Sequence, residues 1–192
     1  MRQFAKFVGA VCIAGLTLNA QSMLDFHSLK RDTQVFERIV DERLKQDFTN
    51  PFAITGDPQA AYLQGYGVVV QFHLNINRNR IRTPFGEIDA PPRIAGRNVL
   101  NAKSGIDPKK EQLGKVRGIL VDCLANYAGA IKQLNAHDRI SITAHIEDRN
   151  ELDPVMRKTV MVVTATRDDI DLLAMRKLST EEFRRKVQVL EY

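Results

Sequence analysis

The chain has 192 residues, of which 44% are hydrophobic and 27% are charged, so its composition is that of a globular protein with a single core. Its formal charge of +5 falls to +3 without residues 1–20, which hold two basic residues and no acidic one. This small charge provides no basic footprint for DNA or RNA, so nucleic-acid-binding proteins are excluded from our expectations.

The first twenty residues have the pattern of a secretory signal peptide. Arg2 and Lys6 form a short positive region, and the apolar run 8–18 follows. This run is well short of the roughly 20 residues that a membrane-spanning helix needs. We therefore expect an exported bacterial protein, periplasmic or secreted, with residues 1–20 as the signal peptide and 21–192 as one domain. An uncleaved N-terminus that tethers a structural protein to the membrane is the alternative.

The segment before the central strand is expected to form one helix and one short strand. Apolar residues recur every three or four positions over 32–48, which predicts an amphipathic helix. The helix should end there, because Pro51 disfavours helical geometry in the residue before it. Residues 52–55 are typical of a short strand, and the Gly-Asp-Pro sequence at 56–58 is typical of a turn.

The clearest strand signal in the chain lies between Val68 and Ile76. Apolar residues occupy every second position, which predicts one face in the core and a wetter face opposite. The core positions are Val68, Val70, Phe72, Leu74 and Ile76, and Val69, Gln71, His73 and Asn75 alternate with them. This strand should stand near the centre of the fold.

Residues 77–105 show no periodic pattern and form an unusually long connection. The connection contains apolar residues as well as a cluster of arginines, so it is not a simple solvated linker. The candidate partner-binding residues are Arg78, Arg80, Arg82, Phe85, Arg93 and Arg97. Arginines would pair with carboxylates or phosphates, and Phe85 would serve as an apolar anchor. The alternative is a surface excursion without a role.

A long helix is expected after this connection. Asp107 and Pro108 provide an N-cap and a proline at the first helical position. One apolar stripe then continues to Leu134, over about seven turns. Cys123 lies on this stripe, which indicates a buried structural thiol rather than a nucleophile. Since Cys12 lies within the signal peptide, no intramolecular disulfide is expected after cleavage.

The C-terminal part of the chain combines strands and short helices. Alternating residues over 139–147 and 159–166 predict two antiparallel strands joined by a polar loop. Asp168 is expected to cap a short helix. Ser179 and Glu182 have the spacing of a capping box, which predicts a last helix.

This order of elements predicts an α+β fold. We expect a two-layer sandwich, in which a small mixed sheet of three to four strands packs on a long central helix and shorter helices. Strands 68–76 and 139–147 could be parallel, connected by a right-handed crossover through the long helix.

Two histidines on the wetter strand faces form the one metal-site candidate. If strands 68–76 and 139–147 pair in a suitable register, His73 and His145 lie side by side, with Glu147 as a third ligand. Imidazole and carboxylate groups would suit zinc or another transition metal. The simpler interpretation is two polar residues on an exposed face. No motif predicts a catalytic residue or a cofactor.

Three segments carry a resemblance to a group of proteins. They are Tyr62-Leu63-Gln64-Gly65-Tyr66-Gly67-Val68, the helix end at Tyr127-Ala128-Gly129, and Leu178-Ser179-Thr180-Glu181-Glu182-Phe183-Arg184. They resemble segments of uncharacterised exported bacterial proteins. The resemblance implies export and no particular activity.

These patterns favour a non-catalytic protein that binds a protein partner in the bacterial envelope through residues 77–105. A metal-dependent enzyme or metal-binding protein that uses His73, His145 and Glu147 is the alternative from another functional class.

Overall fold

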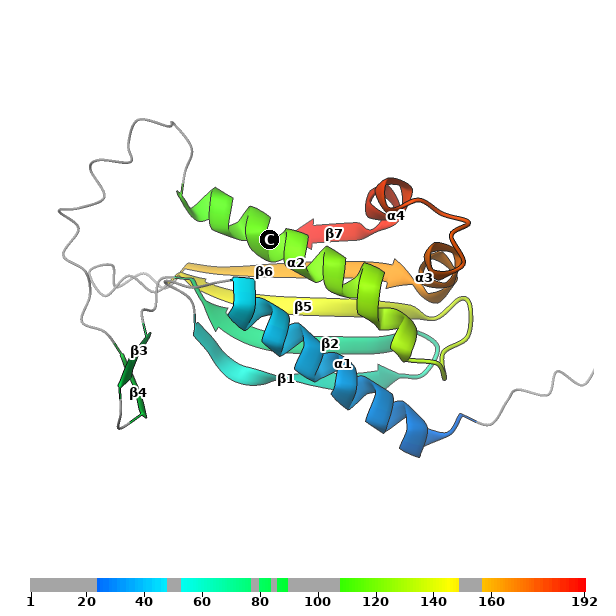
Figure 1. Ribbon diagram of the computed structural model, residues 1–192, viewed down its shortest axis with the longest axis horizontal. Helices are drawn as coiled ribbons and strands as arrows, with labels where there is room; N and C mark the ends of the chain where they lie inside the picture. Colours follow the sequence, from blue (N-terminus) through cyan, green and yellow to red (C-terminus); the bar gives the residue numbers. More distant parts are fainter. Residues whose placement is uncertain (1–23, 48–52, 77–79, 84–85, 90–107, 149–156) are drawn as a thin grey trace, which may run out of the picture.

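The computed structural model describes residues 24–47, 53–76, 80–83, 86–89, 108–148 and 157–192 (Figure 1). These residues form helices, strands and one 3₁₀ turn in a mixed α and β arrangement, which confirms the predicted α+β class. In chain order the elements are α1 (Phe26–Asp47), β1 (Ala53–Leu63), β2 (Gly67–Asn75), β3 (Arg80–Thr83), β4 (Gly86–Asp89), α2 (Pro108–Tyr127), η2 (Ala128–Ala130), β5 (Arg139–Asp148), β6 (Arg157–Thr166), α3 (Arg167–Ala174), α4 (Thr180–Lys186) and β7 (Gln188–Glu191).

The main sheet has five strands in the order β1-β2-β5-β6-β7, where three to four were predicted. Its central pair, β2 and β5, is parallel, as the crossover through the long helix predicted, and the other pairs are antiparallel. β3 and β4 form a separate two-stranded sheet, which we call the hairpin.

β1 is longer than the short strand predicted at 52–55, because it continues through residues 56–58, which were predicted to form a turn. The pairing of β1 with β2 shifts register near Gly56, so the strand accommodates both this glycine and Pro58. An edge strand tolerates proline, because one side of its backbone needs no ladder partner. The carboxylate of Glu37 on α1 accepts a hydrogen bond from the backbone N–H of Ala60. A helix side chain therefore satisfies a donor of the irregular strand.

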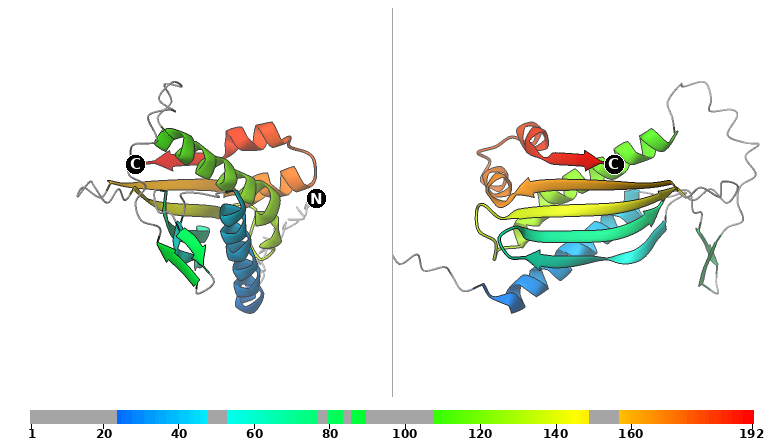
Figure 2. Two further views of the ribbon diagram at one scale, coloured as in Figure 1. Left: turned by 60° about the vertical axis from the view of Figure 1, so that its left-hand side comes forward. Right: turned by 180° about the vertical axis from the view of Figure 1, so that it is seen from behind.

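Helices α1 and α2 lie side by side against one face of the sheet (Figures 1 and 2). The predicted apolar positions of β2 are all buried beneath them, together with the alternating apolar residues of β5 and β6. Phe36 of α1, Phe72 of β2 and Leu120 of α2 are among the largest fully buried side chains. Burial of such side chains stabilises the fold by roughly 1.5–3 kcal/mol each.

The ends of the helices differ from the sequence prediction. α1 begins near Phe26 rather than at residue 32, because the carboxylate of Asp25 accepts hydrogen bonds from the backbone N–H groups of His27 and Ser28. Asp25 is therefore the N-cap residue of α1. α3 is capped by Thr166, whose hydroxyl accepts from the N–H of Asp169, and not by Asp168 as predicted. The capping box of α4 is present as predicted.

The long helix ends earlier than predicted, at Tyr127 rather than Leu134, and continues as the 3₁₀ turn η2. Arg167, which is nearly buried, donates hydrogen bonds from Nη1 to the carbonyl oxygens of Ile131, at 2.6 Å, and Gly129, at 3.4 Å. Its guanidinium also forms an ion pair with Asp171 at 2.8 Å. Arg167 thus takes up carbonyl groups that a continued helix would have bonded internally.

Candidate functional site

The face of the sheet opposite α1 and α2 is the first candidate surface, and we call it the open face. None of the helices that the structure describes lies over it when the sheet is viewed from behind (Figure 2). The predicted wetter sides of β2 and β5 both belong to it. Its half-buried and exposed residues include Gln59, Ala61, Val69, Gln71, His73, Thr143, His145, Glu147, Lys158, Val160, Val162 and Leu190.

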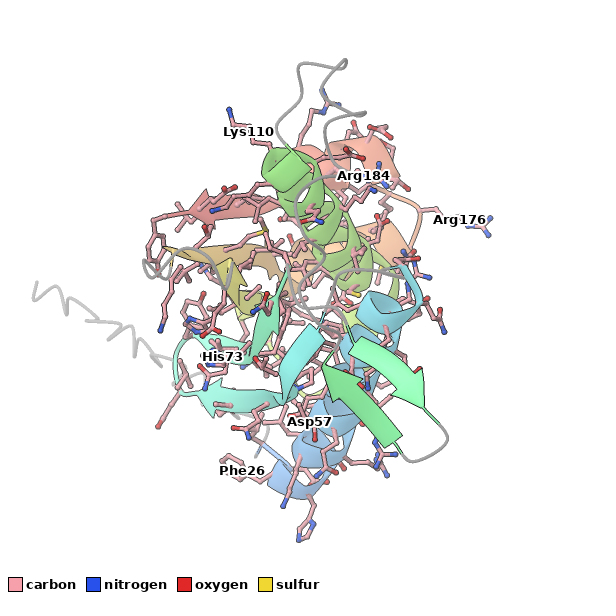
Figure 3. The ribbon with its side chains drawn as sticks, turned by 90° about the vertical axis from the view of Figure 1, so that its left-hand side faces the viewer. Phe26, Asp57, His73, Lys110, Arg176 and Arg184 are labelled. Atoms are coloured by element: carbon pink, nitrogen blue, oxygen red, sulfur yellow. The ribbon has the colours of Figure 1, made fainter. Side chains whose placement is uncertain are left out.

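The open face brings the two strand histidines together. The parallel register of β2 and β5 pairs His73 directly with His145. Their rings are stacked, with 4.6 Å between centroids and 16° between the planes. Figure 3, which looks along the sheet, places His73 on the side away from α1 and α2. The adjacency that the sequence left open is therefore present.

The environment of the pair favours neutral imidazole at His145. Partial burial lowers the pKa of His145, and the neighbouring His73 and Lys158 lower it further. Two protonated rings at this separation would repel each other. The pair therefore resists taking up two protons together.

Glu147 does not complete a three-ligand metal site in this geometry. It lies two residues beyond His145 on β5, paired with Asn75 on one side and Lys158 on the other. Among the described residues there is no group of three or more His, Cys, Asp or Glu side chains that could hold a metal ion. The structure thus provides the two histidines of the predicted site without the third ligand.

A chain of hydroxyl groups lies at the opposite end of the same strands. The Tyr66 hydroxyl is 2.6 Å from that of Ser141, which is 2.7 Å from that of Thr164. The Arg139 guanidinium carbon is 6.0 Å from the centre of the Tyr66 ring. These hydrogen bonds join the turn before β2 to β5 and β6. This network was not predicted from the sequence, because its members are far apart in the chain.

The hairpin contains the described part of the arginine-rich connection. The register places Arg80 opposite Asp89 and Arg82 opposite Glu87, with Ile81 opposite Ile88 between them. The hairpin stands apart from the main sheet, at one end of it (Figure 1). The other candidate partner-binding residues, Arg78, Phe85, Arg93 and Arg97, lie outside the described residues.

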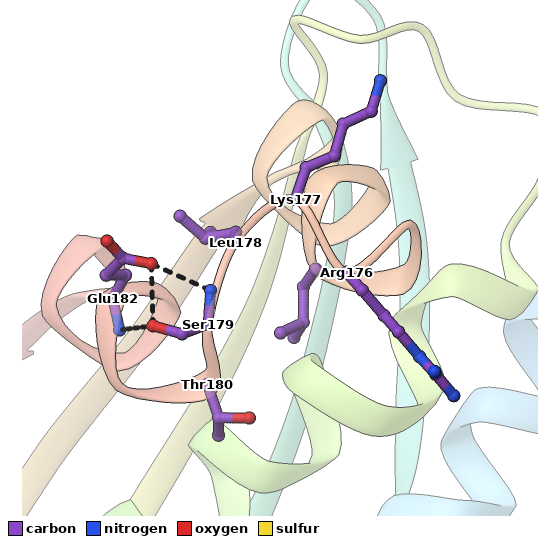
Figure 4. A pocket seen from close by; sticks show the side chains of 7 residues that line it. Arg176, Lys177, Leu178, Ser179, Thr180 and Glu182 are labelled. Carbon is purple, nitrogen blue, oxygen red and sulfur yellow. Dashed lines mark hydrogen bonds between the residues drawn. The ribbon is translucent and has the colours of Figure 1, made fainter.

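A shallow depression between α3 and α4, about 600 Å³ in volume, is a further candidate site (Figure 4). The hydroxyl of Ser179 and the carboxylate of Glu182, which line it, are occupied by the capping box of α4. Arg176 and Lys177 extend away from each other there (Figure 4). Its polar groups therefore do not converge on a common ligand position.

Comparisons with protein-family models, with curated proteins and with solved structures find no match to this chain.

Proposed function

We propose that this chain is a non-catalytic protein of the bacterial cell envelope that binds a protein partner through residues 77–105. The observation that supports the proposal most directly is the hairpin, which forms a sheet of its own instead of joining the main sheet. A two-stranded hairpin in water has marginal stability unless another surface packs on it. A bound partner would provide such a surface.

The residue types of the hairpin suit a protein interface. Its ladder carries an apolar pair, Ile81 opposite Ile88, next to pairs of opposite charge. Apolar anchors surrounded by arginines are typical of interface hot spots, because arginine binds carboxylates through two parallel hydrogen bonds. The sequence adds further arginines and Phe85 to the same segment.

The envelope location rests on the signal-peptide pattern of residues 1–20. In the part of the chain that the structure describes, no helix is long and apolar enough to cross a membrane. The intact mass of the protein recovered from its own envelope tests the location. Loss of residues 1–20 is expected, and retention of those residues would favour a tethered protein instead.

A crosslinking pull-down from the cell envelope tests the binding proposal. The intact protein is compared with a variant in which a short flexible linker replaces residues 78–104. Circular dichroism and thermal unfolding must first show that the variant keeps the fold, which is expected because the hairpin is separate from the main sheet.

We expect a specific partner in the crosslinked sample of the intact protein and its loss from the variant. A matched control carries Val35→Ser on the outer side of α1, where Val35 is 47% exposed, and should retain the partner. Capture that is equal in all three samples would refute binding through residues 77–105.

A further inference from the structure

The stacked histidines of the open face carry imidazole nitrogens that could bind a ligand. Neither imidazole takes part in a hydrogen bond within the described part of the chain, although His73 is exposed and His145 is half-buried. Both rings are attached to neighbouring strands of the sheet, in register with each other. Two nitrogen donors are thus positioned by rigid backbone and remain available to a ligand.

We propose that His73 and His145 together bind one divalent transition-metal ion on the open face. Metal–imidazole bonds are about 2.0–2.1 Å long, so two neighbouring nitrogens are about 3.3 Å apart on a tetrahedral metal and about 2.9 Å apart on a square-planar one such as Cu²⁺. The ring centroids are 4.6 Å apart, so the two rings are close enough for one nitrogen of each to bind the same ion. No hydrogen bond of these imidazoles to another described residue has to break when the metal binds.

The charge state of the pair is compatible with metal binding. A metal ion binds neutral imidazole and competes with protons for it. The ordinary pKa of an imidazole, about 6.5, leaves it mostly neutral at pH 7. Of the charged residues nearby on β5 and β6, Lys158 opposes a cation and Glu147, its ladder partner, favours one.

The number of ligands indicates the kind of site. Closed structural zinc sites use four protein ligands, whereas the described residues offer two at this position. The remaining positions on the metal would be taken by water, or by a donor from a molecule that docks on the open face. Among first-row divalent ions Cu²⁺ binds such nitrogen ligands most tightly, so it is the most sensitive probe.

The test is a Cu²⁺ titration of the full, tag-free chain in the presence of a weak competing ligand, followed by calorimetry and electron paramagnetic resonance. His73→Phe and His145→Phe each remove one donor but keep an aromatic ring for the stack. His137→Phe is the matched control, because His137 is exposed outside the sheet. Urea unfolding checks that all three variants are folded.

We expect one Cu²⁺ per chain with nitrogen coupling from two imidazoles. Each strand variant should weaken binding by about tenfold or more, and the control should leave it unchanged. If a variant fails to fold, the histidine NMR signals of the intact protein decide instead. Substoichiometric Cu²⁺ should broaden the His73 and His145 signals first. No binding by the intact chain, equal binding by the strand variants, or first broadening at His27 or His137 would overturn the proposal.

Discussion

Replacement of Gly67 by alanine should destabilise the fold more than the same replacement at Gly56 or Gly65. Gly67 begins β2 with a φ of +124°, and a Cβ atom there would lie 2.1 Å from the carbonyl oxygen and 2.7 Å from the nitrogen of Arg139. Both contacts are with backbone, which cannot rotate away. β2 and β5 would have to separate at the point where their parallel ladder begins.

The magnitude follows from two contributions. A non-glycine residue held in a sparsely populated backbone region costs about 1–3 kcal/mol. Separation of the strands also weakens the hydrogen bond from the Arg139 N–H to the Tyr66 carbonyl, now 2.7 Å long, which contributes about 0.5–1.5 kcal/mol. Gly67→Ala should therefore lower the free energy of unfolding by about 2–4 kcal/mol, a large part of a typical total of about 5–15 kcal/mol.

Two other glycines separate the contributions. Gly65 has a φ of +78° but open space around its Cβ position, so Gly65→Ala should cost only the backbone strain, about 1–2 kcal/mol. Gly56 has neither a close contact nor a positive φ, so Gly56→Ala should change stability by less than about 1 kcal/mol. Urea unfolding followed by circular dichroism measures all three. A loss for Gly67→Ala no larger than that for Gly65→Ala would refute the reasoning.

Three further predictions concern single side chains. Arg167→Met should lower the free energy of unfolding by about 1–3 kcal/mol, because the carbonyl groups of Ile131 and Gly129 lose their hydrogen-bond donor. Arg185→Met at an exposed position should change it by less than about 0.5 kcal/mol, and equal effects in urea unfolding would contradict this account of Arg167. Burial raises the pKa of the Cys123 thiol to about 12, so Ellman's reagent at pH 8 should label it only after unfolding, and rapid labelling of native protein would show that the thiol is accessible. The pKa of His145 is lower in the folded state, so the unfolded chain binds more protons between that pKa and the ordinary value of about 6.5. The free energy of unfolding, measured with urea, should therefore decrease as the pH falls from 7 towards 5, and it should decrease less in His73→Phe. An equal decrease in that variant would contradict the role of His73.

The parts of the fold that the sequence predicted well are those with a local pattern. The alternation from Val68 to Ile76 and that over 139–147 each correspond to a strand within one residue at either end. The capping box at Ser179 was predicted for the same reason, since its interacting residues are three positions apart. The spacing of nearby residues is sufficient to predict a strand or a helix cap, because the interacting residues all belong to that one element.

The sequence prediction was wrong where distant contacts decide the structure. Gly56 and Pro58 predicted a turn, but pairing with β2 and the hydrogen bond from Ala60 to Glu37 keep the segment in an edge strand. Beyond the early end of α2, carbonyl groups accept hydrogen bonds from Arg167, more than thirty residues further along the chain. Such partners leave no signal in the local pattern.

The candidate metal site also combines features that the local sequence pattern predicts with features that depend on distant contacts. Alternation placed His73 and His145 on the wetter faces of their strands, but only the parallel register of β2 with β5 makes them neighbours. Glu147 lies two residues further along β5, and the described residues hold no group of three possible ligands there. The sequence could therefore supply the donors of a metal site but not their number.

Site-specific photocrosslinking in the living cell tests the proposed binding function most directly. A photoreactive amino acid replaces Ile81 of the hairpin in one variant and exposed Val35 of α1 in another. We predict a crosslink from position 81 to a single envelope protein, and no such product from position 35. A product from position 35 with none from position 81 would contradict the proposal that the chain binds its partner through residues 77–105.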